Sequence, residues 1–347
     1  MISLKSASKK THANMPKICW DKQGEPVFSK EVADKLFKST YRDNKIQYRY
    51  NPLKGMPKPD PPKQSFMSKP STREELTNIV RNKRNKSAPG TNAVPYLVYK
   101  KCPKILAHIH PIFNRIWRKK NIPLSWRVGE AVLIPKEEDR TRPELFRNIT
   151  LTNVSGKMFF QVLANRLLSY MVGNGYIDQA IQKGFLPGVA GCVEHTQVLM
   201  ETLLDAKKHT KEIVVAWLDL ANAYGSVAHN LIQYALEWYH VPANMRELIY
   251  HYYDELFVRI RTKQWKSEWF MYQIGLFQGC PLSVVLFLIV FNLLLDLLKT
   301  KQELGYQLKN LELIQLQKAY ADDLTLIAKS KTSSSGDFPQ LDKNNES

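Results

Sequence analysis

Three aspartates stand at the ends of apolar segments. Asp219 interrupts a nearly continuous apolar run from Ile213 to Leu220, and Asp322 and Asp323 lie between two further apolar stretches. Their chain neighbours include Trp217, Leu218, Tyr320 and Leu324. Burying carboxylates among such side chains is costly unless a cation or a hydrogen-bond donor compensates. Carboxylate oxygens suit Mg²⁺ or Mn²⁺, and two such ions together can activate an attacking hydroxyl and stabilise a leaving phosphate group. For the adjacent pair alone, an ordinary type I′ hairpin turn is the simpler reading.

The segments around these aspartates predict strands. The run from Ile213 to Leu220 is typical of a central strand covered on both faces, and LQKAYADDLTLIAK reads as a hairpin with the Asp pair at its tip. Between them, Val284 to Leu298 is the longest apolar stretch, interrupted by Asn292 and Asp296. It is shorter than the roughly 18 to 20 residues that span a bilayer, so we expect a buried core helix.

The elements that precede these strands in the chain are predicted from the spacing of apolar residues and from proline and helix-capping residues. Proline-rich residues 1–70 predict an extension and linker with one short helix near 29–37, and Ser71 with Glu74 predicts a capping box that opens the first domain helix. Further helices are expected at 96–119, 153–172, 192–208, 229–239 and 245–256, a strand at 129–136, and a hairpin at 258–274.

The composition favours a polyanionic partner. Lys and Arg number 50 against 32 Asp and Glu, which gives a net charge of +18. Neutralising phosphates releases counterions and strengthens binding, although an anionic membrane or a merely soluble basic surface remain alternatives. The four cysteines form no CxxC pair, which indicates an intracellular, reducing compartment, nucleus or cytoplasm unresolved. Cys192 and His195 form an isolated CxxH, too few ligands for structural zinc.

Five blocks between about Ser87 and Lys329 resemble reverse transcriptases of LINE-like, non-LTR retrotransposons, and they appear in the order that this family has. They are Ala88-Pro89-Gly90 with Gln182-Lys183-Gly184-Phe185, Arg147-Asn148-Ile149-Thr150-Leu151 with Leu163-Ala164-Asn165-Arg166-Leu167, Leu218 to Tyr224 (LDLANAY), Phe277 to Ser283 (FQGCPLS), and Tyr320-Ala321-Asp322-Asp323. Two positions depart from the family: Arg147-Asn148-Ile149 lacks the usual proline, and position 225 is glycine where many relatives carry a second acid.

The resemblance implies a role for each matching residue. Asp219 and Asp322 are expected to bind two Mg²⁺ or Mn²⁺ ions, with Asp323 in support. Tyr224 is expected to lie under the sugar and exclude a 2′-hydroxyl, although the same ring could simply be a core aromatic. Four others would meet the incoming deoxynucleoside triphosphate: Gln278, Gly279, Lys136 and Arg147. Lysine and arginine on a basic protein are also commonly just solvated.

The resemblance also implies an α+β right-hand polymerase. We expect fingers with the start of the palm at 71–208, a palm with an antiparallel, helix-covered sheet at 209–331, and a disordered tail at 332–347. No thumb, endonuclease or RNase H pattern is recognised, which predicts a truncated, poorly processive RNA-directed DNA polymerase working on an RNA template and a DNA primer. The alternatives are a non-catalytic RNA-binding remnant and, less favoured, a membrane-associated basic protein.

Overall fold

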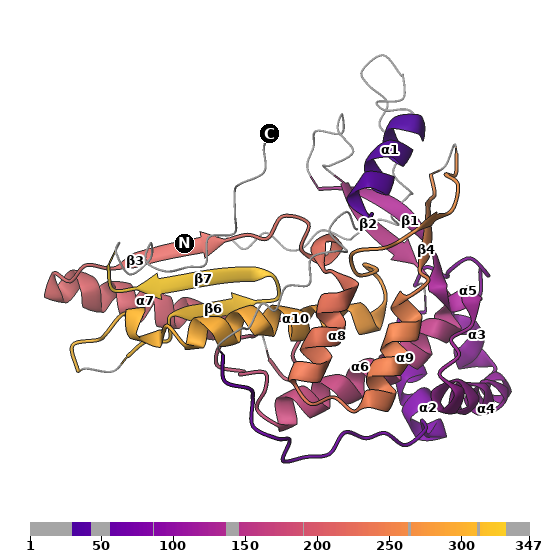
Figure 1. Ribbon diagram of the computed structural model, residues 1–347, viewed down its shortest axis with the longest axis horizontal. Helices are drawn as coiled ribbons and strands as arrows, with labels where there is room; N and C mark the ends of the chain where they lie inside the picture. The colour runs from indigo at the N-terminus through magenta and orange to yellow at the C-terminus, as the bar shows by residue number, and fades with distance from the viewer. Residues whose placement is uncertain are drawn as a thin grey trace. The chain divides into compact units, whose positions relative to one another are not determined.

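The computed structural model describes residues 30–42, 56–85, 87–136, 146–189, 191–262, 265–310 and 313–330 (Figure 1). Its elements are α1 (Lys30–Thr40), α2 (Arg73–Asn82), α3 (Tyr96–Lys101), α4 (Pro103–Lys119), α5 (Leu124–Arg127), β1 (Val128–Pro135), β2 (Phe146–Leu151), α6 (Val154–Gly173), α7 (Val193–His209), β3 (Val214–Leu218), η2 (Ala223–Ser226), α8 (His229–Trp238), α9 (Ala243–Tyr253), β4 (Phe257–Ile260), β5 (Phe270–Met271), α10 (Pro281–Lys299), η3 (Gln302–Leu304), β6 (Gln317–Tyr320) and β7 (Asp323–Ala328). The α+β class is therefore confirmed. The predicted tail lies outside the described residues, as do 1–29 and 43–55 of the predicted extension.

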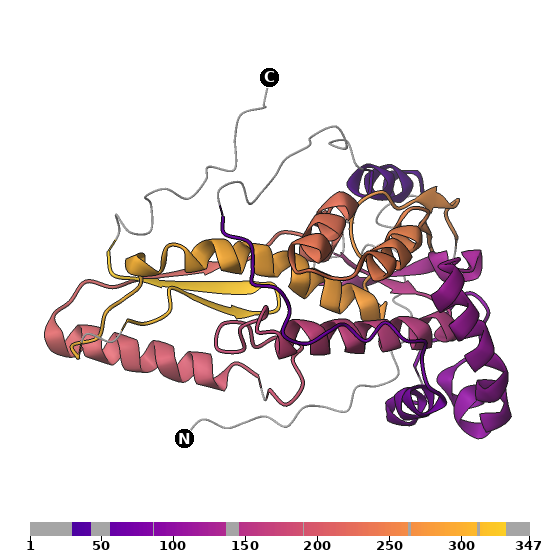
Figure 2. The ribbon, with the colours of Figure 1, turned by 60° about the horizontal axis from the view of Figure 1, so that its bottom comes forward.

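The chain divides into two compact units. The first contains Met1–Lys45, Ser68–Leu163 and Glu247–Ser283, and the second contains Ile46–Met67, Ala164–Arg246 and Val284–Ser347. The first unit holds a mixed four-stranded sheet in the order β2-β1-β4-β5, in which β1 runs antiparallel to β2 and parallel to β4. Helices α2, α3 and α4 pack together in the same unit (Figure 2). The predicted strand at 129–136 and the hairpin at 258–274 are thus confirmed as β1 and as β4 with β5.

The capping box of α2 lies one residue later than predicted. Thr72, not Ser71, is the N-cap: its Oγ1 accepts from the Glu75 amide at 3.1 Å, and its own amide donates to Glu75 at 2.7 Å. Ser71 is instead buried and donates its hydroxyl to Asn114. Two overlapping S/T-x-x-E patterns stand side by side in STREE, and packing against α4 selects the second.

The single helix predicted at 96–119 is two helices. Helix α3 ends at Lys101, Cys102 leaves the helical region (φ −122°, ψ 75°), and α4 begins with Pro103 at its first position. Proline lacks an amide hydrogen and disfavours helical geometry in the preceding residue, so the break falls at Cys102. Leu106, Phe113 and Ile116 form the buried stripe of α4 that the apolar spacing predicts, whereas Ile112, which the same spacing includes, is exposed.

The second unit holds an antiparallel three-stranded sheet in the order β3-β7-β6. Helices α7 and α10 run along it (Figure 1), and Ala206 of α7 packs in a buried cluster with Ile327 of β7. Strand β3 is the edge of this sheet, and Trp217 is 71% exposed. The prediction of a central strand covered on both faces is therefore wrong, because an apolar run reports composition and not which of its faces is covered.

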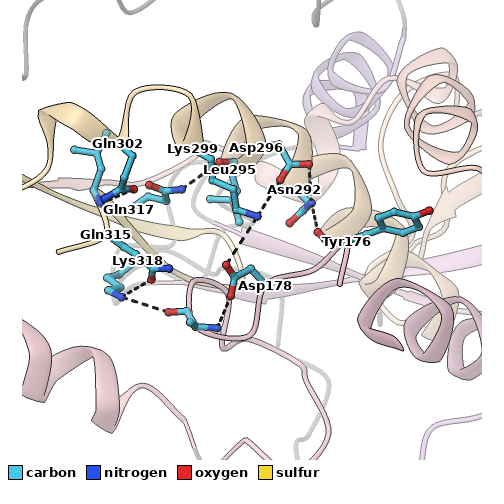
Figure 3. A network of polar contacts seen from close by, with 12 residues as sticks. Tyr176, Asp178, Asn292, Leu295, Asp296, Lys299, Gln302, Gln315, Gln317 and Lys318 are labelled. Carbon is cyan, nitrogen blue, oxygen red and sulfur yellow. Dashed lines mark hydrogen bonds and ion pairs between the residues drawn. The ribbon is translucent and has the colours of Figure 1, made fainter. Parts of the chain in front are cut away.

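Helix α10 is the apolar helix expected at 284–298. Among the described residues it alone is long and apolar enough to cross a membrane, but 67% of its most apolar stretch is buried inside the protein. Its polar interruptions are used in the core: Asn292 donates to the Tyr176 carbonyl at 2.9 Å, and the hydroxyl of Tyr239 donates to Asp296 at 2.7 Å. Figure 3 shows Asn292 and Asp296 within this polar network. The core-helix prediction is confirmed.

Residues 56–67, assigned by sequence to a linker, are part of the second unit and pack within it. The hydroxyl of Tyr176 donates to the Asp60 carbonyl at 2.9 Å, and the amide of Gln64 donates to the Asn174 side chain at 2.8 Å. Phe66 is buried edge-on against Tyr170. This proline-rich segment is therefore held by backbone hydrogen bonds and one aromatic anchor.

Candidate functional site

Asp219 and Asp323 lie opposite each other at one end of the β3–β7 ladder. The last paired residues are Leu218 and Leu324, so the same antiparallel register carried one step further sets Asp219 across from Asp323. Residues that oppose each other in this way project from the same face of a sheet. Strand β6 pairs Tyr320 with Asp323, which leaves Ala321 and Asp322 as the two-residue turn. The fold thus brings all three predicted aspartates to one strand end.

The aspartates are less buried than their neighbours in sequence implied. Asp219 and Asp323 are exposed, and Asp322 is half-buried. Of the apolar neighbours, Leu324 is buried, whereas Trp217, Leu218 and Tyr320 are exposed. The premise that these carboxylates are buried among apolar side chains is therefore wrong. Their proximity to each other, not their desolvation, is what distinguishes them.

Electrostatic coupling among the three acids is visible at Asp323. Partial desolvation raises the pKa of Asp323 above its ordinary value, and the negative charges of Asp322 and Asp219 raise it further. A like charge nearby disfavours the ionised carboxylate, so the shift reports an excess of negative charge at this end of the sheet. A cation bound there would relieve the repulsion.

The described residues offer two carboxylate donors, and not three, to a divalent cation. Across the described ranges, no three His, Cys, Asp or Glu side chains converge into a group that could hold a metal ion. Mg²⁺ commonly takes only one or two protein carboxylates and completes its shell with water and substrate phosphates. Asp219 and Asp322 offer that number of hard oxygen donors.

The turn that carries Asp322 is held by one buried glutamine. The Oε1 atom of Gln182 accepts from the Ala321 amide and from the Gly184 amide, both at 2.8 Å, and its Nε2 donates to the Ala321 carbonyl at 3.1 Å. Sequence reasoning placed Gln182 in a family block but gave it no role. The only signal available was a polar residue directly before the Lys183-Gly184 step.

Tyr224 lies close enough to Asp322 to feel its charge. It belongs to the short 3-10 helix η2 that follows Asp219, and its ring is half-buried and stacked on Phe287. Burial raises the pKa of the Tyr224 hydroxyl, and the negative charge of Asp322 raises it further. The structure therefore brings Tyr224 within electrostatic reach of Asp322, and its contact with a sugar stays a prediction.

The other four predicted residues belong to the first unit. Arg147 is exposed on β2 and pairs with Ile134 of β1, and Lys136 is exposed just after β1, so both lie at the loop end of this hairpin. The Gln278 carbonyl accepts from the Thr150 amide at 2.7 Å. Thr150 is three residues beyond Arg147, roughly 10 Å along an extended strand. The four residues therefore lie along one hairpin, with Gln278 and Gly279 at the other end of β2.

Gly279 has a packing reason to be glycine. Its φ of +128° is one that side-chain-bearing residues rarely adopt, and a Cβ there would lie 2.5 Å from the Thr150 carbonyl oxygen. The close backbone approach seen here is thus to β2. Contact with a nucleotide remains a prediction.

Of the CxxH pair, only His195 makes a packing contact described by the structure. Cys192 is exposed and precedes α7, and a ring nitrogen of His195 lies 2.8 Å from the Ile181 carbonyl oxygen. Partial burial lowers the pKa of His195, which favours the neutral ring. This contact fixes α7 against the segment that carries Gln182.

Comparison with known proteins gives a consistent set of matches. Residues 134–343 match the family model described as reverse transcriptase (RNA-dependent DNA polymerase). The chain is 32% identical over 221 residues to a retrovirus-related Pol polyprotein from the type-2 retrotransposable element R2DM of Drosophila melanogaster, covering 63% of this chain and 20% of that protein. It is 28% identical over 264 residues to the Pol polyprotein of a type-1 element R2 of Nasonia vitripennis, covering 76% and 24%. The chain therefore spans about a fifth to a quarter of the length of these curated relatives.

Proposed function

Because the chain belongs to the reverse transcriptase family, we propose that it copies RNA into DNA by adding deoxynucleotides to a primer 3′-hydroxyl. The observation that carries the proposal is that Asp219, Asp322 and Asp323 lie at the same end of the β3–β7–β6 sheet. The RNA template and the DNA primer are the proposed partners, and the net charge of +18 suits both. The three-stranded sheet is assigned to the palm and the β1–β2 hairpin to the fingers.

In the second unit, the carboxylates would hold the reaction centre. Asp219 and Asp322 would each bind divalent cations, and Asp323 would add negative charge that strengthens cation binding. When bound, two Mg²⁺ or Mn²⁺ ions activate an attacking 3′-hydroxyl and stabilise the leaving pyrophosphate. Tyr224 would support the sugar of the incoming nucleotide and exclude a 2′-hydroxyl, since its ring is backed by Phe287.

In the first unit, the β1–β2 hairpin would bind the nucleotide. The exposed cations Lys136 and Arg147 would offset the charge of the triphosphate. Gln278 and Gly279, docked on Thr150, would present backbone and amide groups to the base or sugar. All four roles are carried over from the family resemblance.

Primer extension tests the proposal directly. The purified chain, an oligo(dT) primer on poly(rA), and dTTP should give extended products with Mg²⁺ or Mn²⁺ and none with EDTA. Asp322→Asn and Asp219→Asn should abolish extension, because each removes a cation ligand, while binding of the primer-template is retained. Glu201→Gln, an exposed acid on α7, is the matched control and should extend normally. Full extension by Asp322→Asn would end the proposal.

A second candidate is a non-catalytic RNA-binding remnant. Two observations favour it: Asp219 and Asp323 are exposed, and no three potential ligands in the described part of the chain form a group that could hold a metal ion. A binder of this kind would retain poly(rA) with the same affinity in wild type, Asp322→Asn and EDTA, and would extend no primer under any condition.

A further inference from the structure

The hairpin turn that carries Asp322 is held by a glutamine from another part of the chain. Gln182 is only 2% exposed, and its side-chain amide meets both backbone groups of Ala321 as well as the amide of Gly184. An amide nitrogen can only donate to a carbonyl, and an amide oxygen can only accept from an N–H group. The orientation of the Gln182 side chain is therefore fixed by its three backbone partners.

The turn itself needs such support. Ala321 has a φ of +58°, in the left-handed region that disfavours a residue with a Cβ. It is also buried, so its backbone N–H and C=O cannot be satisfied by bulk water. Conformations of this kind persist where surrounding contacts over-determine them. Gln182 supplies both of the hydrogen bonds that Ala321 makes to a side chain.

The backbone on either side of Gln182 is joined to the same hairpin. The Lys183 amide donates to the Ala319 carbonyl at 2.9 Å, and the Ala319 amide donates to the Ile181 carbonyl at 2.8 Å. Gly184 packs so closely on the turn that a Cβ there would lie 2.1 Å from the Ala321 nitrogen. The segment from Ile181 to Gly184 thus lies beside β6 and reaches the turn after it.

We propose that Gln182 is a positioning residue that fixes the Ala321–Asp322 turn and thereby sets how well Asp322 and Asp219 bind divalent cations together. The inference rests on the proposed function for its catalytic consequence, but the clamp itself does not. Without the clamp, Ala321 can leave its left-handed conformation, and the adjacent Asp322 moves with it. A displacement of about 1 Å at a reacting group can lower a rate by about 100-fold.

A matched pair of buried glutamines separates positioning from simple packing. Gln182→Leu removes all three hydrogen bonds, whereas Gln317→Leu removes the bond from a second fully buried glutamine to the Leu295 carbonyl, 3.2 Å away and not at the turn (Figure 3). We expect hydrogen exchange of the peptide covering 318–324 to speed up at least tenfold in Gln182→Leu and to change little in Gln317→Leu. We also expect Mn²⁺ binding to weaken at least threefold in the first variant only. Equal behaviour of the two variants, or wild-type exchange in Gln182→Leu, overturns the proposal.

Gly184→Ala provides an independent route to the same effect. It leaves the Gln182 side chain in place but drives a methyl group against the Ala321 amide. The same faster exchange and weaker Mn²⁺ binding are expected, and retention of both wild-type values would contradict the clamp. This variant also tests the proposal should Gln182→Leu fail to fold.

The effect of Gln182 on catalysis is measured separately, by primer extension. In primer extension, Gln182→Leu should lower kcat by about 10- to 100-fold and raise the Mg²⁺ concentration for half-maximal rate, with the KM for dTTP nearly unchanged. A wild-type chain that extends no primer would contradict the proposed function, while the exchange and Mn²⁺ measurements would still decide the clamp. An unchanged Mg²⁺ requirement in an active Gln182→Leu variant would overturn the positioning role.

Discussion

The ring of Tyr224 stacks on the ring of Phe287, with 4.8 Å between centroids and 10° between planes. Phe287 is buried on α10 and stacks in turn on Phe291. Tyr224 lies in η2, five residues after Asp219, so this stack joins the segment that follows β3 to α10. The Tyr224 ring is therefore held in place by packing against α10.

We predict that Tyr224→Ala relaxes sugar selection. Without the ring, a 2′-hydroxyl meets no obstacle, and incorporation of rUTP relative to dTTP should rise by about tenfold or more. Tyr224→Phe keeps the stacked ring and should keep the wild-type preference. The measurement is the ratio of kcat/KM for the two nucleotides on poly(rA). A preference unchanged in Tyr224→Ala would assign the ring to packing alone.

Asp323 predicts a stability that depends on pH. Its pKa is raised by partial desolvation and then by the charges of Asp322 and Asp219. A raised carboxyl pKa means that the folded chain holds the proton more tightly than the unfolded chain. Ionised Asp323 therefore destabilises the fold only at higher pH. The effect is absent below the pKa of Asp323 in the unfolded chain, about 3.9, grows as the pH rises through the pKa in the folded chain, and is complete above that value.

Asp323→Asn should accordingly raise the Tm at pH 7 in the absence of divalent cations. The gain should shrink at high salt, which screens exposed charges, and should disappear near pH 3.5. Thermal melts from pH 3.5 to 8 measure it, with Glu201→Gln as an exposed control in the same unit. A lower Tm for Asp323→Asn at pH 7 would show that the acids are not in repulsive contact.

Glu130 of β1 anchors the first unit through charge. It is 3% exposed and forms ion pairs with Arg259, Arg261 and Lys266. Burial alone would raise its pKa, but the hydrogen bonds and charges of the two arginines hold the pKa below the ordinary value. The ion pairs of Glu130 therefore stabilise the fold fully above the pKa of Glu130 in the unfolded chain, about 4.3. That stability is lost as the pH falls through the pKa of Glu130 in the folded chain.

Glu130→Gln should destabilise the chain by about 2 kcal/mol at pH 7, less than a fully buried pair because both arginines are partly exposed. The difference should narrow as the pH approaches 3. Urea unfolding at both pH values measures it. Glu255→Gln breaks an ion pair between Arg127 and an exposed glutamate and should cost at most about 0.5 kcal/mol. Equal losses in the two variants would contradict the prediction.

Gly279→Ala should destabilise the first unit by about 3 kcal/mol. The cost combines a strained φ with a methyl group driven against the Thr150 carbonyl. Gly188→Ala is the control, since its φ of +75° is also left-handed but a Cβ there meets nothing within 4 Å, so only about 1 kcal/mol is expected. Urea unfolding gives both values. If Gly279→Ala lowers the free energy of unfolding no more than Gly188→Ala does, β2 must shift to make room for the added methyl group.

The parts of the site that sequence could predict are those encoded locally. The hairpin around Tyr320-Ala321-Asp322-Asp323 follows from two apolar runs and a short polar tip, and α10 follows from its length and composition. That Asp219 lies at the same strand end as Asp322 was expected only from the family resemblance, because no local pattern specifies which strands pair.

What sequence could not predict depends on tertiary partners. Nothing in the sequence separates an apolar strand covered on both faces from the exposed edge that β3 forms. The shift of the capping box from Ser71 to Thr72 follows from the contact of Ser71 with Asn114. The contact of Gln182 with Ala321 spans 139 positions, and a single glutamine in a loop carries no sign of its partner.

The exposed edge strand has a consequence for how the protein behaves at high concentration. In the part of the chain that the structure describes, no strand pairs with the outer side of β3, and Trp217, Leu218 and Leu220 are exposed there. Such an edge is a template on which a second molecule can add its own strand, so concentrated solutions should self-associate and precipitate. Natural edge strands often carry a lysine that opposes such pairing. Trp217→Lys should therefore keep the protein soluble at concentrations at which the wild type precipitates.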